Sequence, residues 1–235
     1  MMDIDTIREE LWSLADAKYR QFNSSLMPGT DNVLGVRVPL LRKLAGEIAR
    51  SDDWRTFVEE SDLLFNEEPM LQGMVIAKAK MDWEERKHYM EMFVPRINNW
   101  AVCDVYCNDL KAVTTNREKD MWIFILPYLQ AAPEFERRFG IVMLFYYINQ
   151  KHIDFLFNYA DTFDHPAYYT RMAIAWLLSA CFVKFPEETM AYFKRSKLDK
   201  WTYRKAIQKT RESRRVDKAT KEELKQLLRY RLRSR

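Results

Sequence analysis

Arg138-Phe-Gly-Ile141 is repeated as Arg171-Met-Ala-Ile174 and as Arg204-Lys-Ala-Ile207, and both intervals are 33 residues. Two weaker copies, Leu71-Gln-Gly-Met74 and Asn99-Trp-Ala-Val102, keep the small and the apolar residue without the arginine, at irregular spacing. Repeats of about 33 to 47 residues made only of helix pairs are typical of solenoids. The small residue at a fixed place in each copy lets neighbouring helices approach closely.

The composition also favours helices. Hydrophobic residues make up 48% of the 235 residues and charged residues 31%, which is enough apolar surface for a core. Only 5 Gly and 8 Pro occur, whereas a fold rich in strands and turns needs more glycine. We therefore expect an all-α fold, an α-α superhelix of HEAT- or armadillo-like repeats that forms a single domain over residues 1–235, with a concave groove.

The first helices are predicted from periodicity. Residues Asp5–Arg20 should form one amphipathic helix with Asp5 as its cap, and Asn23–Asn32 should form a loop because Pro, Gly, Asp and Asn are concentrated there. A second helix should begin at Val38, with Pro39 at an early position. Its buried stripe should consist of Leu40, Leu41, Leu44 and Ile48.

Positive charge is concentrated at the end of the chain. The whole sequence carries a formal charge of +4, but residues 200–235 hold 14 Lys and Arg against 4 acids, so the preceding residues are slightly acidic. Such a segment is either a phosphate-binding edge or a solvated helix surface. Its Leu224, Leu227 and Leu228 predict a final helix that caps the repeats.

The repeated arginines are candidate phosphate ligands. Equivalent helices of a solenoid line up on one face, so Arg138, Arg171 and Arg204 should form a stripe along the concave side. Such a stripe suits the phosphates of a nucleic-acid strand. The alternative is that these arginines cap helices or pair with nearby acids.

Three cysteines, Cys103, Cys107 and Cys181, cannot all pair within one chain, which favours a reducing, cytoplasmic setting. No signal peptide and no long apolar stretch is present, so we expect no membrane association. The three histidines lack the spacing of metal ligands, and there is no glycine-rich phosphate loop. We therefore expect neither a metal site nor a cofactor.

Trp100 and Asp104 are the candidate reactive pair, because residues four apart share one face of a helix. Trp176 occupies, in its own repeat, the position that Asp104 holds, so the repeat register predicts that these three residues and Arg138 face one groove. The alternative is that the tryptophans belong to the core and that Asp104 bonds a neighbouring Asn or Arg.

At these residues the chain resembles the AlkD family of HEAT-like repeat DNA glycosylases, and the resemblance extends over most of the sequence. It rests on Leu34-Gly-Val-Arg-Val-Pro39, Asn99-Trp-Ala-Val-Cys-Asp104, Arg137-Arg-Phe-Gly-Ile141 and Tyr168-Tyr-Thr-Arg-Met-Ala-Ile-Ala-Trp176. The resemblance implies an enzyme that binds double-stranded DNA and excises cationic N3- and N7-alkylpurines without flipping the base out of the duplex. We expect the protein to be a monomer.

The resemblance also implies residue roles. Trp100 and Trp176 would contact the sugar and backbone of the damaged nucleotide, Asp104 would be the catalytic carboxylate, and Arg138 would bind a phosphate. Together with the repeat register and the basic C-terminal segment, it predicts DNA-binding residues Arg37, Arg138, Arg171, Arg204, Lys205 and Arg211.

Two departures from the family pattern predict a weaker grip on DNA. Active members carry a helix before the Leu-Gly-Val segment that enters the minor groove, but here we expect a loop without any Lys or Arg between Arg20 and Arg37. Ser179 stands where the family usually has arginine. The alternative function is therefore a catalytically weak or inactive HEAT-like module that binds DNA or a protein partner.

Overall fold

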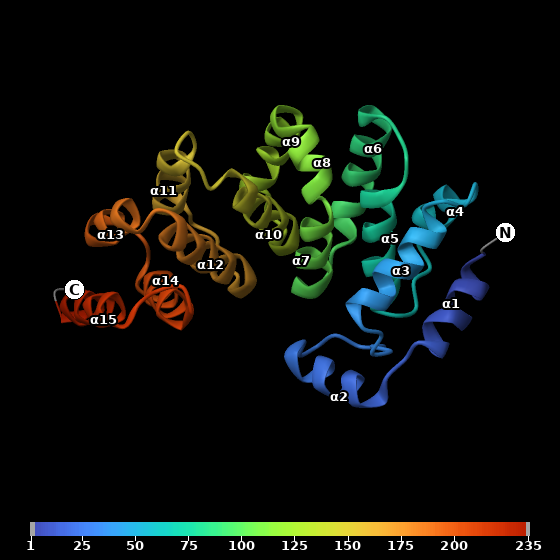
Figure 1. Cartoon of the computed structure of the whole chain (residues 1–235), viewed down its shortest axis with the longest axis horizontal. Coiled ribbons are helices and arrows are strands. Elements are labelled where there is room, and N and C mark those ends of the chain that lie inside the picture. Colours follow the sequence, from blue (N-terminus) through green and yellow to red (C-terminus); the bar gives the residue numbers. More distant parts are fainter. Residues whose placement is uncertain (1–2, 234–235) are drawn as a thin grey trace. The chain divides into compact units, whose positions relative to one another are not determined.

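The computed structural model describes residues 3–233, which form fifteen α-helices, three short 3₁₀-helices and no strand (Figure 1). Helices account for 74% of the chain, so the predicted all-α repeat fold is confirmed. None of the helices in this range has the length and apolar character needed to cross a membrane. The chain divides into two compact units, Met1–Phe124 and Ile125–Arg235. That the two units act as one domain stays a prediction.

The first unit is built from helix pairs joined by short connections. Its helices are α1 (Ile4–Ser13), α2 (Ala17–Leu26), α3 (Val38–Ile48), α4 (Trp54–Glu59), α5 (Glu67–Lys78), α6 (Trp83–Phe93), η1 (Val94–Arg96), α7 (Trp100–Asp109), α8 (Lys111–Asn116) and, at its end, α9 (Glu118–Ile125). α3 packs against α5, and α5 packs against α7. The weaker repeat copies lie on α5 and at the start of α7, so both copies mark helices that pack against each other.

The small residue of the repeat has the predicted role. A Cβ atom at Gly73 on α5 would lie 2.9 Å from Cδ2 of Tyr106 on α7 and 3.0 Å from the ring of Phe93. Carbon atoms do not approach this closely, so any larger residue would push the helices apart. Glycine at this position therefore sets the distance between α5 and α7.

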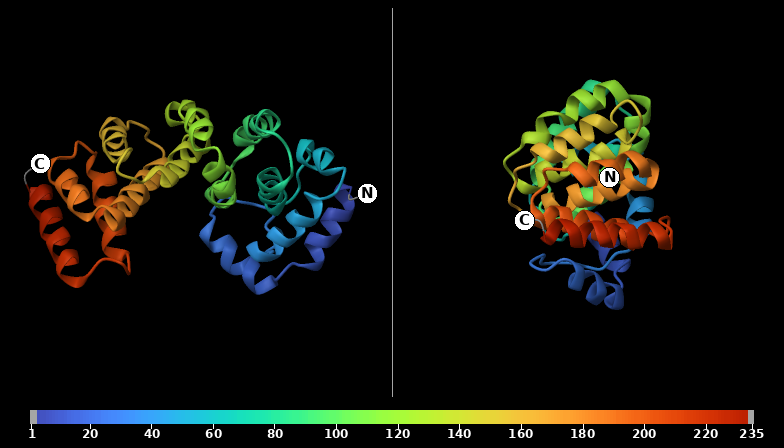
Figure 2. Two further views of the ribbon diagram at one scale, coloured as in Figure 1. Left: turned by 45° about the horizontal axis from the view of Figure 1, so that its top comes forward. Right: turned by 90° about the vertical axis from the view of Figure 1, so that its left-hand side faces the viewer.

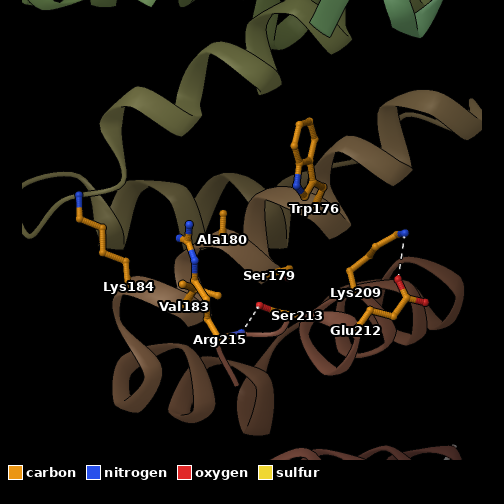
Figure 3. Close-up of a pocket in the computed structure, with 9 residues that line it drawn as sticks. All are labelled: Trp176, Ser179, Ala180, Val183, Lys184, Lys209, Glu212, Ser213 and Arg215. Carbon is orange, nitrogen blue, oxygen red and sulfur yellow. Dashed lines mark hydrogen bonds and ion pairs between the residues drawn. The ribbon is translucent and has the colours of Figure 1, made fainter. Parts of the chain in front are cut away.

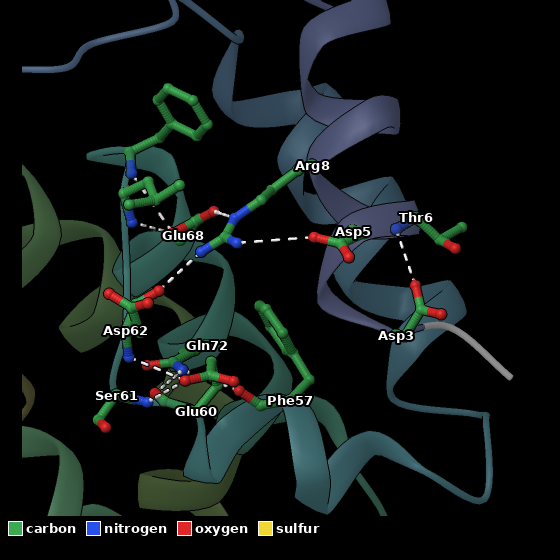
Figure 4. Close-up of polar contacts among 12 residues, drawn as sticks. Asp3, Asp5, Thr6, Arg8, Phe57, Glu60, Ser61, Asp62, Glu68 and Gln72 are labelled. Carbon is green, nitrogen blue, oxygen red and sulfur yellow. Dashed lines mark hydrogen bonds and ion pairs between the residues drawn. The ribbon is translucent and has the colours of Figure 1, made fainter.

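An ion pair between a partly exposed arginine and a buried carboxylate ties α1 to α5 (Figure 4). The carboxylate of Glu68, with no exposed surface, accepts hydrogen bonds from Nε of Arg8 at 2.7 Å and from the backbone N–H of Leu64 at 2.6 Å. Nη2 of Arg8 also donates to the carbonyl oxygen of Asp62 at 2.6 Å. Because the buried carboxylate is both paired and hydrogen-bonded, this contact can hold the N-terminal helix in place.

The N-terminal region differs from the prediction. α1 is capped by Asp3, whose carboxylate accepts from the backbone N–H of Thr6, and a new helix starts after Asp16, which caps α2 by accepting from Tyr19. A second capping aspartate therefore divides the expected single helix Asp5–Arg20, and the loop predicted to start at residue 23 starts only at Met27. The expected absence of a helix before the Leu-Gly-Val segment is wrong.

The helix predicted from Val38 is confirmed as α3, with Pro39 in its first turn. Leu41, Leu44 and Ile48 are buried as expected. Leu40 is 36% exposed, so its assignment to the buried stripe is wrong. The apolar stripe of α3 is narrower than predicted, because Leu40 and Leu41 point in directions about 100° apart on a helix.

α2 is held at its ends and exposed along its length, since none of its residues is fully buried. Gly35 has a positive φ of 87°, and a Cβ there would lie 2.6 Å from Cβ of Arg20, so only glycine lets α2 lie this close. After the last turn, Met27 is inserted into the core at 1% exposure. Phe22 stays 60% exposed.

The segment that supports α2 is anchored by a buried carboxylate. Glu67, 1% exposed at the start of α5, accepts hydrogen bonds from three successive backbone N–H groups, those of Leu34 at 3.0 Å, Gly35 at 2.7 Å and Val36 at 3.2 Å. Three charge-assisted bonds hold this non-helical segment in one conformation.

The second unit repeats the same construction. Its helices after α9 are η2 (Pro127–Gln130), α10 (Glu134–Met143), η3 (Leu144–Tyr147), α11 (Ile153–Thr162), α12 (Tyr168–Lys184), α13 (Pro186–Arg195), α14 (Lys200–Glu212) and α15 (Lys218–Arg233). α10, α12 and α14 carry the three strong repeat copies, and each packs against the next. Gly140 on α10 allows close contact with the backbone of Tyr128, because a Cβ there would lie 3.0 Å from that carbonyl carbon.

The predicted final helix is present. α15 packs against α14 and ends the unit (Figure 2), and Leu224 is fully buried. Arg231 fastens the helix from its other end: Nη1 donates to the carbonyl oxygen of Phe193 at 3.2 Å, and the guanidinium lies 4.0 Å from the ring centroid of Tyr203. α15 therefore covers the apolar face that the last repeat would otherwise expose.

Candidate functional site

The N-terminus of α7 is fixed by Asn99, 5% exposed. Its side-chain oxygen accepts from the backbone N–H groups of Ala101 and Val102, both at 3.0 Å, while its amide donates to the side-chain oxygens of Asn66 at 2.7 Å and Asn98 at 2.9 Å. All the hydrogen-bonding capacity of this buried amide is therefore used to start the helix at the next residue.

Trp100, the first residue of α7, is half-buried under the end of α2. Its Nε1 donates to the carbonyl oxygen of Leu26 at 3.2 Å, and the indole packs against a small core cluster of Met27, Val33 and Ala101. The hydrogen bond satisfies one of the carbonyl groups that a helix end leaves open. The orientation of Trp100 therefore depends on α2.

Asp104 lies one turn after Trp100 on the same side of α7 and is also half-buried. Its neighbours Cys103 and Cys107 face the core and are fully buried or nearly so. A carboxylate at the boundary between core and solvent can still approach a bound ligand. The first unit therefore brings Trp100 and Asp104 together, as predicted.

Trp176, in the middle of α12, is 41% exposed, which is unusual for so large an apolar side chain. One side of its indole contacts Phe145, with ring centroids 4.5 Å apart. The residue also lines a pocket of about 580 Å³ formed by α12, α14 and the connection that follows α14 (Figure 3). Trp176 is thus placed to touch a ligand, whereas Trp100 is held by α2.

The repeated arginines brace successive helices. Arg138, 5% exposed on α10, donates from Nη1 to the carbonyl oxygen of Tyr169 in the first turn of α12 at 2.7 Å. One repeat later, Arg171 on α12 contacts Asp199 through Nη2, and its Nε donates to Oγ1 of Thr202 at 3.2 Å at the start of α14. Both arginines reach the N-terminal turn of the next repeat helix.

The contact of Arg171 belongs to a larger charged and aromatic cluster. Its guanidinium carbon lies 4.3 Å from the ring centroid of Trp201, and Nζ of Lys205 lies 5.9 Å from the same centroid. Although burial raises the pKa of Asp199, hydrogen bonds from Thr202 and Arg171 outweigh it, so this pKa lies below its usual value. The stabilisation is therefore present above about pH 4 and is lost as the pH falls through the lowered pKa.

Arg171→Ala is expected to lower the free energy of unfolding by about 1.5 kcal/mol, because it removes hydrogen bonds to a charged partner and to a hydroxyl group. In a chain of this size the melting temperature should fall by about 4 °C. Arg204→Ala is the matched control: Arg204 occupies the same repeat position but is exposed, so this variant should stay within about 0.5 kcal/mol of wild type. If thermal denaturation shows that Arg171→Ala and Arg204→Ala lose equal amounts of stability, the bracing role of Arg171 is contradicted.

The remaining predicted DNA-binding residues are spread over both units. In the first, Arg37 donates to Asp16 at 2.8 Å and lies 4.7 Å from the ring centroid of Tyr19, so it also holds α2. In the second, Lys205 donates to Oε1 of Gln208 at 3.1 Å, and Arg211 donates to a backbone carbonyl of α15 at 3.2 Å.

Sequence reasoning missed the residues that support the candidate site. The cap Asn99 stands directly before a predicted helix, a signal that could have been used. Glu67 and the second capping aspartate, Asp16, carry weaker signals, because their partners are defined only by the folded backbone. The pocket beside Trp176 also includes Lys209 and Arg215, which were not among the predicted residues.

Comparison with known families gives a match to the family model described as DNA alkylation repair enzyme, over residues 7–210. No curated protein and no solved structure matches the chain. Within residues 3–233, no three His, Cys, Asp or Glu side chains are grouped as the ligands of a metal ion would be.

Proposed function

Since the chain belongs to the DNA alkylation repair enzyme family, we propose that it is a DNA glycosylase, which hydrolyses the N-glycosidic bond of cationic N3- and N7-alkylpurines in duplex DNA. The observation that carries the proposal is the pair Trp100 and Asp104, an indole and a carboxylate one turn apart on α7 at the edge of the core. The base would be released while it remains in the duplex, so that the pair acts on the sugar.

The reaction needs a modest catalyst. An alkylated purine already carries a positive charge, so the bond from C1′ of the sugar to the base breaks with its electron pair moving to the base, which leaves as a neutral molecule. The sugar becomes oxocarbenium-like, and a water molecule then adds to C1′ and releases a proton. A carboxylate stabilises such a cation or orients the water, as carboxylates do in glycoside hydrolysis.

In this proposal Asp104 is the catalytic carboxylate. Trp100 would place its π face near the developing charge, a contact that contributes about 0.5 to 2 kcal/mol. The hydrogen bond of Trp100 to Leu26 supports this role, because an indole held in advance loses no side-chain entropy when the substrate binds.

The second unit would bind the sugar-phosphate backbone. Trp176 supports this role by its exposure, and Arg204 by its charge and exposure. Arg138 would contact a phosphate, as the family resemblance implies, and its hydrogen bond to the carbonyl oxygen of Tyr169 would orient its guanidinium. α2 would lie against the DNA through its exposed residues, which include Phe22 and Leu26.

A second candidate function is a HEAT-like module that binds DNA without catalysis. The bracing contacts of Arg138 and Arg171 favour it, because arginines committed to protein acceptors contribute fewer phosphate contacts. Such a module would show DNA affinity that falls as salt rises and no release of base.

Release of base from alkylated DNA distinguishes the two functions. Duplex DNA treated with a methylating agent is incubated with the protein, and the liberated purines are separated and quantified against spontaneous release. We expect N3- and N7-methylpurines to be liberated faster than in buffer alone, and the resulting abasic sites to persist until they are cleaved by alkali. Salt-dependent binding of the same duplex without release would support the non-catalytic module instead.

A further inference from the structure

We propose that the pocket beside Trp176 binds a segment of the DNA backbone, with Arg215 and Lys209 contacting its phosphates. This inference rests on the proposed function, since it assigns a subsite for the DNA that the second unit would bind. The pocket belongs wholly to the second unit and has a volume of about 580 Å³, which is enough for a sugar-phosphate segment.

The lining of the pocket has the chemistry of an anion site. The lining carries three cationic side chains, one carboxylate and two serines: the lining residues are Trp176, Ser179, Ala180, Val183, Lys184, Lys209, Glu212, Ser213 and Arg215. Positive charge in a concave site attracts phosphates more strongly than the same charge on an open surface. The exposed indole at its edge provides a surface for the adjoining sugar.

Arg215 is the central ligand. It lies in the connection between α14 and α15, and its side chain extends beside Ala180 and Val183 of α12 (Figure 3). Its backbone N–H donates to Oγ of Ser213 at 3.2 Å, which fixes the connection, while its guanidinium takes part in no hydrogen bond or ion pair among residues 3–233. Because Ser179 is small, the pocket has room for a bound group next to this guanidinium.

Lys209 is positioned by an ion pair with Glu212. Its Nζ lies 3.0 Å from Oε2 of Glu212, whose other oxygen accepts from Gln208 at 2.8 Å. Hydrogen bonds from Gln208 and Lys209 lower the pKa of Glu212, so this carboxylate is charged at neutral pH and competes with a phosphate for Lys209. Lys184 contributes less, because its ammonium group donates to the carbonyl oxygen of Ile148.

The arrangement predicts opposite effects for two substitutions. Arg215→Ala should weaken binding of undamaged duplex about tenfold and reduce the slope of log affinity against log salt by about 1, as expected for one lost phosphate contact. Glu212→Gln should strengthen binding about threefold, because it frees Lys209 from a competing charge. Arg215→Lys should retain part of the affinity through its point charge.

Arg214→Ala is the matched control. Arg214 is adjacent in sequence and exposed, but it does not line the pocket, so a general charge effect should change affinity less than twofold in about 0.15 M salt. Binding is measured by fluorescence anisotropy with the full chain, after thermal denaturation has shown that each variant is folded. Equal losses for Arg214→Ala and Arg215→Ala, or no gain for Glu212→Gln, would overturn the proposal.

Two further measurements distinguish a backbone site from a free-nucleotide site, and the subsite from the glycosylase proposal. A deoxynucleoside monophosphate at millimolar concentration should not displace the duplex from the protein. If it does displace the duplex, and if this effect disappears in Arg215→Ala, the pocket binds free nucleotides. That result would overturn the proposal that the pocket binds the DNA backbone. Base release by wild type is measured in parallel. If Arg215→Ala weakens binding but wild type releases no base, the subsite stands and the glycosylase proposal fails; the reverse result rejects only the subsite.

Discussion

Asp104→Asn is expected to slow base release in single-turnover experiments by a factor on the order of 10² or more, with DNA affinity nearly unchanged. The amide has the size of the carboxylate but no negative charge, so it can neither stabilise an oxocarbenium-like sugar nor accept a proton from the attacking water. Because Asp104 is half-buried at the end of the first turn of α7, the exchange leaves the core intact.

The matched control is Asp120→Asn. Asp120 is also a helical aspartate of the first unit, and it pairs with Arg117 at 3.4 Å at the surface, where its side chain is 42% exposed. Surface pairs of this kind contribute little to stability, so this variant should release base at the rate of wild type. Equal rates for wild type and Asp104→Asn would reject the catalytic role, and a parallel loss of DNA affinity would indicate a binding role instead.

The repeat pattern predicted the fold because it records packing directly. A Cβ atom at Gly73 or at Gly140 would collide with a neighbouring helix or backbone, and both residues stand at the small position of the repeat. Steric contact between adjacent repeats is local and periodic, so one sequence shows it. The spacing of Trp100 and Asp104 was predictable for the same reason, because a helix alone brings residues four apart to one face.

The role of the repeated arginine could not be predicted in this way. Whether Arg138 meets a phosphate or a protein acceptor depends on the position of a backbone carbonyl 31 residues further along the chain, that of Tyr169. Arg204 carries the same pattern on α14, but its side chain is exposed. The same motif is therefore buried in one copy and exposed in another, and under the proposed function Arg204 is the repeated arginine most accessible to DNA.

The N-terminal helices were mispredicted because two capping aspartates, Asp3 and Asp16, lie outside the hydrophobic periodicity that defined the expected helix. α2 buries none of its residues completely, so its sequence lacks the apolar stripe of a core helix. Its position comes instead from Gly35 and from the carboxylate of Glu67. This dependence has a measurable consequence.

Glu67→Ala is expected to lower the free energy of unfolding by about 4 kcal/mol. The substitution leaves the buried N–H groups of Leu34, Gly35 and Val36 without an acceptor, and each unsatisfied donor costs about 1 to 3 kcal/mol before water or a shift of the backbone relieves part of the loss. Denaturation by urea measures the change, and hydrogen exchange should show these three amides losing protection first.

Glu67→Gln separates charge from shape. The remaining side-chain oxygen of the glutamine can accept the hydrogen bonds from Gly35 and Val36. Its amide nitrogen would face the N–H of Leu34, and two donors cannot bond each other. The free energy of unfolding is therefore expected to fall by about 2 kcal/mol. The control is Glu84→Ala at an exposed position on α6, which should change stability by less than about 0.5 kcal/mol.

Because Gly35 supports α2 and α2 accepts the hydrogen bond of Trp100, loosening this segment should also slow base release at temperatures where the protein is fully folded. Unchanged protection of the three amides would show that Glu67 does not hold the segment, and an unchanged rate would show that Trp100 keeps its orientation without α2.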